Sequence, residues 1–157
     1  SMGIGKGLNA AAFASFSLAM IIARFSGDWA LEKFGPAAVV RMGGFGGALI
    51  WGSAIAIAVP LSDSHPLPAF IIINIGFAAA GLGIGPMFPA FILAASRIPG
   101  IAPGVAIARV GVTGIAGYFI GPTVTGFLAD IFSLPVAMFY PVALLAMAGF
   151  FSRVIKV

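Results

Sequence analysis

Residues that could perform chemistry are few in this sequence. It contains no cysteine, a single histidine and only four acidic residues, which are Asp28, Glu32, Asp63 and Asp130. Each acid lies at the end of an apolar run, and none forms the close pair of carboxylates that general acid–base catalysis often uses. His65 lies beside Asp63 in a polar stretch, where a histidine is ordinarily solvated. The sequence therefore predicts no enzymatic activity, no metal site and no cofactor.

The densest group of charges lies in the stretch GDWALEKFG, which contains Asp28, Glu32 and Lys33. Gly35 ends this stretch and permits a sharp backbone turn, and Pro36 is suited to begin a following helix. Opposite charges on a short connection can pair with one another or with the end of a neighbouring helix. We therefore expect a tight connection between two helices that latches one state of a moving bundle. The alternative is that these charges only anchor the helix ends at a membrane face.

Four residues inside apolar runs are candidates for lining a solute cavity, and they are Asn74, Pro86, Arg109 and Tyr118. Arg109 lies about six residues, or roughly 9 Å, into its run. A charge at that depth must reach water along its side chain, pair with Asp28 or Glu32, or contact an anionic solute. The sequence leaves these three explanations open.

Glycines spaced by four residues occur in three of the runs. The pairs are Gly81 with Gly85, Gly43 with Gly47, and Gly117 with Gly121, the last followed by Pro122. Such spacing lets the backbones of two helices approach closely. The first pair also precedes Pro86, and an interrupted helix near the bilayer midplane is a pointer to a transporter's binding site. We expect packing and hinge roles for these glycines and for Pro122, and a binding role can coexist with them.

The composition indicates that these residues lie in a membrane. Of the 157 residues, 61% are hydrophobic and 8% are charged, whereas soluble proteins have about 25% charged residues. A soluble domain of this size has too little interior to bury so much apolar surface. The apolar runs approach or exceed the ~20 residues of a spanning helix, and they lack the period-two alternation of a membrane barrel. We expect an all-α membrane protein in which residues 1–157 form one domain, a bundle of five transmembrane helices at about residues 8–26, 37–59, 68–95, 103–130 and 135–153.

The basic residues predict the orientation of the chain. Those near the first and third connections and the carboxyl end are Arg24, Lys33, Arg41, Arg97, Arg153 and Lys156, and the second and fourth connections contain none. By the positive-inside rule, the first and third connections and the carboxyl terminus are cytoplasmic and the amino terminus is outside. The basic residues are scattered singly, so the sequence does not predict nucleic-acid binding.

The segment from Gly27 to Pro36 resembles the acidic–basic–glycine loop signature of the major facilitator superfamily. The resemblance matches Glu32 to the acidic residue, Lys33 to the basic residue and Gly35 to the turn glycine, with Arg41 as the basic residue entering the next helix. Asp28 stands where the commonest form has glycine, and Gly27 lies one place earlier.

The later sequence is also similar to that family. The pattern of Gly117, Gly121 and Pro122 resembles the Gly-Pro pattern of the eleventh family helix, and the likeness extends over nearly all of residues 8–152. The five expected helices would then correspond to helices eight to twelve of a twelve-helix transporter, which is the carboxyl-terminal half without its first helix. A match to helices two to six is the weaker alternative, because both halves share the repeat.

The resemblance implies part of a secondary active transporter that moves a small solute by alternating access. The alternative is a truncated membrane module that does not transport and that packs or oligomerises with other helices. A passive pore is a third and weaker option, because no ring-forming charge lies in mid-helix.

The expected partners are the lipid bilayer, a small-molecule solute, and either the missing transporter half or a second copy of the chain in a parallel homo-oligomer. The resemblance implies the inner membrane of a bacterium. We also expect a fragment of a longer protein, because an odd number of helices that begins outside is unusual for a complete gene product.

Cysteine accessibility tests the predicted orientation without interference, because the chain has no cysteine of its own. We expect a membrane-impermeant maleimide added to intact cells to label Ser64→Cys, which lies in the second connection. Lys33→Cys should react only after the membrane is opened, because the positive-inside rule places the first connection in the cytoplasm. The reverse labelling pattern would overturn this orientation.

Overall fold

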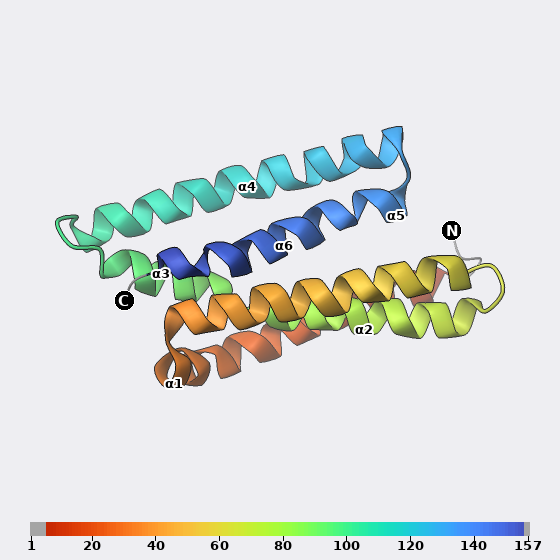
Figure 1. Cartoon of the computed structure of the whole chain (residues 1–157), viewed down its shortest axis with the longest axis horizontal. Helices are drawn as coiled ribbons and strands as arrows, with labels where there is room; N and C mark the ends of the chain where they lie inside the picture. Colours follow the sequence, from red (N-terminus) through yellow and green to blue (C-terminus); the bar gives the residue numbers. More distant parts are fainter. Residues whose placement is uncertain (1–5, 156–157) are drawn as a thin grey trace.

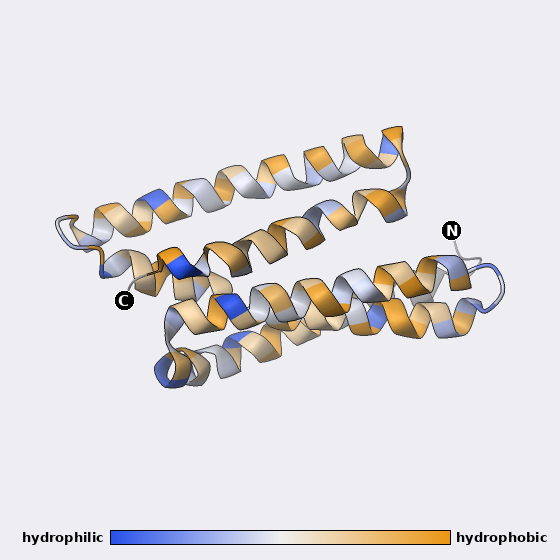
Figure 2. Cartoon of the chain, viewed as in Figure 1, coloured by the Kyte–Doolittle hydropathy of each residue, from blue (hydrophilic) through white to orange (hydrophobic). Residues whose placement is uncertain are grey.

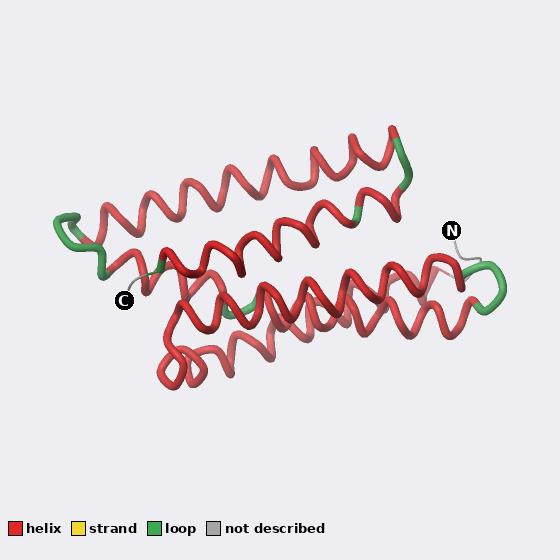
Figure 3. The backbone as a smooth tube through the Cα atoms, viewed as in Figure 1, coloured by secondary structure: helices red, strands yellow, loops and turns green. Residues whose placement is uncertain are grey.

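The computed structural model describes the backbone of residues 6–155 and the side chains of residues 13–155. Over this part of the chain it is helical throughout, with short connections and no strand (Figures 1 and 3). The elements are α1 (Lys6–Leu61), α2 (Pro66–Ile84), α3 (Met87–Ser96), α4 (Pro103–Ile131), α5 (Leu134–Ala137), α6 (Phe139–Phe151) and the 3₁₀ helix η1 (Ser152–Val154). The amino terminus and Lys156, on which part of the predicted orientation depends, lie outside the described residues.

Helix α1 consists of two arms that meet at Gly35. The first arm is residues 6–34 and the second arm is residues 36–61, and Gly35 has a non-helical backbone with φ 77° and ψ 161°. A positive φ is readily adopted only by glycine. Figure 1 shows α1 running to one end of the bundle and then back along it. Gly35 is therefore the point at which the chain reverses.

The predicted number of spanning helices is wrong, although the prediction of an all-α membrane protein is confirmed. Four helical segments are long and apolar enough to cross a membrane, and they are Phe13–Leu61, Pro66–Ser96, Pro103–Ile131 and Leu134–Val154. The first contains both predicted helices 8–26 and 37–59. Residues 27–34, expected as a connection, are helical because Ala, Leu, Glu and Lys favour helix and a single glycine completes the turn.

The length of α1 explains why the bend is needed. A straight helix of the 49 residues in its membrane candidate would be ~73 Å long, more than twice the ~30 Å hydrocarbon core. Each arm alone is close to the length of one crossing. The bend at Gly35 therefore divides α1 into two arms, each of which can fit a bilayer.

Helix α2 lies between the two arms of α1, with glycines on both of its faces. A Cβ atom added to Gly81 would lie 2.5 Å from the carbonyl oxygen of Phe16 in the first arm. One added to Gly83 would lie 2.5 Å from the carbonyl oxygen of Gly43 in the second arm. Gly85 likewise faces the first arm, where an added Cβ would lie 2.6 Å from that of Ala23. The structure thus places Gly81 and Gly85 at a backbone-to-backbone helix contact.

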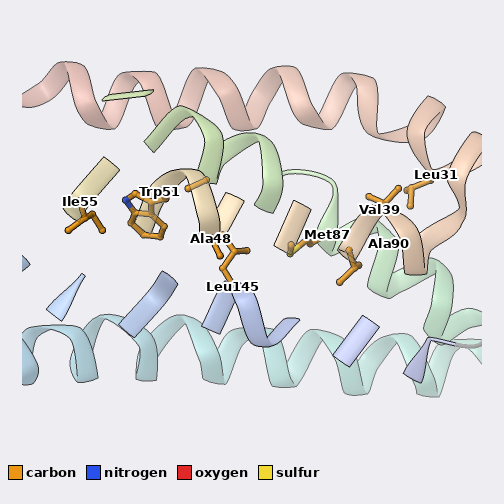
Figure 4. Close-up of a cluster of buried hydrophobic side chains, with 10 residues drawn as sticks. Leu31, Val39, Ala48, Trp51, Ile55, Met87, Ala90 and Leu145 are labelled. Atoms are coloured by element: carbon orange, nitrogen blue, oxygen red, sulfur yellow. The ribbon is translucent and has the colours of Figure 1, made fainter. Parts of the chain in front are cut away.

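The core between these helices is built mainly from small and branched side chains. It includes Leu31, Val39, Val40, Ala48, Trp51, Ile55, Ala80, Met87, Ala90 and Leu145 (Figure 4). Leu145 brings α6 against the second arm, next to a close approach of Gly44 and Gly149. This core fixes α1, α2 and α6 as one packed unit.

Helix α4 lies at the edge of the bundle and has few neighbours. Of its residues, Ala106 alone is buried. No atom lies within 4 Å of a Cβ added to Gly117 or Gly121, and Pro122 is exposed. The expected packing at these three residues therefore has no partner among the described residues. Figure 2 shows that apolar residues nonetheless cover much of α4, a surface that lipid or other helices can cover.

Alanine substitution can distinguish the glycines that pack against α1 from the exposed glycines of α4. Gly85→Ala should lower the thermal unfolding temperature in detergent, because overpacking against Ala23 costs about 1–3 kcal/mol. Gly121→Ala is the matched control, since it adds the same methyl group in open space and should raise that temperature by removing a helix cost of about 0.5–1 kcal/mol. Equal effects of the two substitutions, measured by circular dichroism, would contradict this packing.

Candidate functional site

A cavity of about 830 Å³ lies between the first arm of α1, α3 and α4. Residues of the chain's carboxyl end, Val154 and Ile155, complete its lining. It lies toward the end of the bundle that carries the Gly35 bend and the connection between α3 and α4 (Figure 1). Its volume falls in the range of about 300–1,000 Å³ that is typical of small-molecule sites.

Two arginines from different helices line this cavity, and both are exposed. Arg24 comes from the first arm of α1 and Arg109 from α4, and no acidic residue lines the cavity with them. Within residues 13–155 neither arginine forms an ion pair with a carboxylate. The pairing of Arg109 with Asp28 or Glu32, one of the three explanations that the sequence allowed, is therefore not formed in this structure.

The remaining walls of the cavity are apolar. They include Phe88 and Phe91 of α3 and Ile98 of the connection that follows it. Thr113 is the one hydroxyl residue of the lining, and its Oγ1 donates a hydrogen bond to the carbonyl oxygen of Arg109 at 2.8 Å, one helical turn back. The two guanidinium groups are consequently the main polar groups that a ligand would meet.

The break between α2 and α3 forms one edge of this cavity. Pro86 lies at the break and is buried, while Ile84 before it and Phe88 after it line the cavity. A Cβ added to Gly27 would lie 3.2 Å from the Cβ of Pro86. Pro86 therefore shapes the wall and contacts the charged stretch of α1, but it does not itself face the cavity.

Two predicted cavity residues lie elsewhere. The Oγ of Ser15 donates a hydrogen bond to Oδ1 of Asn74 at 3.0 Å, and Nδ2 of Asn74 donates to the carbonyl oxygen of Phe70 at 2.8 Å. Tyr118 is 77% exposed on α4 and contacts the neighbouring ring of Phe119 edge to face. Asn74 thus joins α2 to the first arm, and Tyr118 faces outward. Neither lines the cavity.

The predicted gating residues gather around the bend without forming ion pairs. Asp28, Glu32 and Arg41 are exposed. Lys33 places its Nζ 4.8 Å from the centroid of the Trp29 ring, a cation–π contact within α1. Among residues 13–155 the opposite charges of this stretch make no mutual ion pair. The attachment of the bend is instead apolar, through buried Leu31 and through Gly27 against Pro86.

Sequence reasoning used Arg24 only to predict orientation and did not identify it as a cavity residue. Its position four residues after Met20, which also lines the cavity, places both on one face of the first arm. That spacing was available in the sequence. The sequence does not show which neighbouring helix this face contacts, because both faces of the arm are apolar.

The comparisons with known proteins found two similar chains. An uncharacterised MFS-type transporter of Yersinia pestis is 32% identical over 125 residues, which cover 80% of this chain and 30% of that protein. The membrane protein MosC of Rhizobium meliloti is 27% identical over 131 residues, which cover 83% of this chain and 30% of that protein. No family model and no solved structure matches. This chain spans about 30% of the length of the relatives it matches.

The apolar helices and these relatives agree on the setting of the cavity. This is an integral membrane protein. The cavity, with its two arginines, is therefore a site within a bundle of membrane helices. A charge in that setting carries a larger cost than the same charge in a soluble cleft.

The role of Asn74 in joining helices can be tested by measuring the thermal stability of variants. Asn74→Ala should lower the thermal unfolding temperature in detergent, because interhelical hydrogen bonds in membranes contribute about 0.6 kcal/mol on average. Thr123→Val is the control, since the Thr123 hydroxyl donates only to the carbonyl oxygen of Phe119 in its own helix. A decrease as large for Thr123→Val as for Asn74→Ala would contradict the assignment.

Proposed function

We propose that this chain is part of a secondary active transporter of the major facilitator type, which moves a small solute by alternating access. The similarity to a protein named as an MFS-type transporter supports the class. The loop signature around Glu32, Lys33 and Gly35 is the local feature that agrees with it. The arms of α1 would be the eighth and ninth family helices, α2 with α3 the tenth, α4 the eleventh, and α5 with α6 the twelfth.

The contact between Gly27 and Pro86 is the observation that carries this proposal. It joins the charged stretch before the bend to the break between α2 and α3. Interrupted helices mark binding sites in transporters, and alternating access requires that such a site respond to movement of the bundle. A shift of the charged stretch would be passed through Pro86 to Ile84 and Phe88, which lie two residues on either side of it and line the cavity.

The exposed glycine face of α4 supports a second feature of the proposal, which is assembly with further helices. The partner would be the other transporter half or a second copy of the chain in a parallel homo-oligomer. If the chain does not transport, this face favours the alternative of a membrane module that packs with other helices. We place the protein in a bacterial inner membrane with the bend on the cytoplasmic side.

Uptake into proteoliposomes tests transport by the chain. Vesicles containing the protein, alone or with a co-expressed amino-terminal half of a similar transporter, would be offered a panel of labelled solutes. We expect accumulation of at least one solute above empty vesicles. Flux equal to that of empty vesicles, for every solute and in both preparations, would contradict the proposal.

A pair of glycine variants tests the role of the bend in that flux. Gly35 and Gly100 both have φ 77°, a backbone conformation in which alanine is strained, so both substitutions carry a local conformational cost. Gly100 lies in the connection between α3 and α4, outside the charged stretch. We expect Gly35→Ala to reduce uptake several-fold and Gly100→Ala to leave most of it. Equal reductions would show that the bend has no special role.

A further inference from the structure

We propose that the cavity between the first arm, α3 and α4 binds an amphipathic organic anion, a molecule with one acidic group on an apolar body. The inference that this anion is the transported solute rests on the proposed function. The inference that the cavity binds the anion rests only on the composition of the cavity.

The charge of the cavity selects an anion. Arg24 and Arg109 contribute two positive charges, and the lining holds no acidic residue. Within residues 13–155 neither arginine is neutralised by an ion pair. Both arginines are exposed, so a ligand in the cavity can reach their charges. Two positive charges without a carboxylate partner attract an anionic ligand and repel a cationic one.

The geometry of the guanidinium group favours a carboxylate or a phosphate. Each arginine presents several N–H donors in a planar fork that matches two oxygens of such a group. Thr113 adds no free donor at this point, because its hydroxyl proton is used by the carbonyl oxygen of Arg109. The two arginines therefore supply most of the hydrogen bonds for the acidic end of the ligand.

The other walls require that the rest of the ligand be apolar. One wall of the cavity contains Phe88 and Phe91 of α3 and Ile98 of the connection after it. A volume of about 830 Å³ is far larger than inorganic phosphate needs. Such an ion would leave the aromatic walls in contact with water, whereas an apolar body would cover them and gain about 25 cal/mol per Å² buried. The combination selects an amphiphile over a simple ion or a sugar.

An acidic amphiphile can reach this cavity from water or from the lipid bilayer. A soluble organic acid and an anionic phospholipid share the chemistry just described. The binding experiment therefore includes one arm for each source.

The test is equilibrium binding of radiolabelled 4-phenylbutyrate to the full chain in phosphatidylcholine nanodiscs. We expect saturable binding that excess unlabelled 4-phenylbutyrate removes and that 4-phenylbutanol, with the same apolar body but no charge, removes at least tenfold less effectively. Equal competition by the neutral alcohol would overturn the proposal.

Substitution of the arginines identifies the site. Arg24→Gln and Arg109→Gln should each weaken binding about tenfold or more, which corresponds to roughly 1.4 kcal/mol. Arg153→Gln is the matched control, because Arg153 lies near the cavity but its guanidinium faces the Phe150 ring at 5.5 Å. Unchanged affinity in the Arg24→Gln, Arg109→Gln double variant would overturn the assignment.

A further variant leaves both arginines in place. It tests whether the weaker binding of the arginine variants could result from misfolding rather than from the lost charge. A Cβ added to Gly114 has only the Phe88 ring near it, at 3.9 Å, so Gly114→Leu can enter the cavity without displacing backbone. It should abolish most binding while the thermal unfolding temperature stays the same or rises. Full binding in this variant would contradict the location of the site.

The lipid arm replaces part of the phosphatidylcholine by phosphatidylglycerol. Displacement of the probe by this lipid supports the site and identifies the membrane as its source of ligand, and retention of the probe supports a soluble anion. Absence of probe binding while another solute is taken up into vesicles would overturn this inference and leave the proposed function intact. Probe binding without uptake of any solute would contradict the proposed function and leave this inference intact.

Discussion

The close approach of α2 to both arms of α1 is the contact on which the rest of the structure depends. Helices in lipid gain little from hydrophobic burial against one another, so their association depends on van der Waals packing and a few hydrogen bonds. Gly43 and Gly83 allow that packing on one face of α2, and Gly81 and Gly85 allow it on the other. A methyl group at any of these positions would meet atoms of the neighbouring helix. This contact holds the two arms together and sets Pro86 against Gly27.

The same contact divides the cavity into a well-packed wall and a loosely packed wall. The first arm and α3 belong to the unit that α2 organises, whereas α4 has one buried residue, Ala106. Few side-chain contacts would have to be broken to change the distance between α4 and α3. The glycine contacts of α2 would be unaffected by such a movement. Alternating access by rigid-body movement, as proposed above, would use this kind of division, since one group of helices moves against another around the site.

The sequence predicted the helices better than their partners. The expected spans 68–95 and 103–130 agree closely with Pro66–Ser96 and Pro103–Ile131, because prolines in the first helical turn are local signals. The helical conformation of residues 27–34 was not predicted, since a single glycine with a positive φ makes the turn for which a longer loop was expected. Arg109 was recognised by its depth in an apolar run. Its partner Arg24 was not, because a helix that is apolar on all sides does not reveal which face meets α3.

The position of Arg24 and Arg109 connects membrane insertion to ligand choice. Arginines near a helix end anchor that end at a membrane face, because moving the charge toward the hydrocarbon centre is costly. In this bundle the same charges line a cavity. Arg24 belongs to the first arm and Arg109 to α4, so a ligand that contacts both would join the well-packed wall to the loosely packed one. Because an arginine is costly in contact with lipid and favourable in contact with an anion, the same two side chains limit both how the helices insert and which ligand the cavity favours.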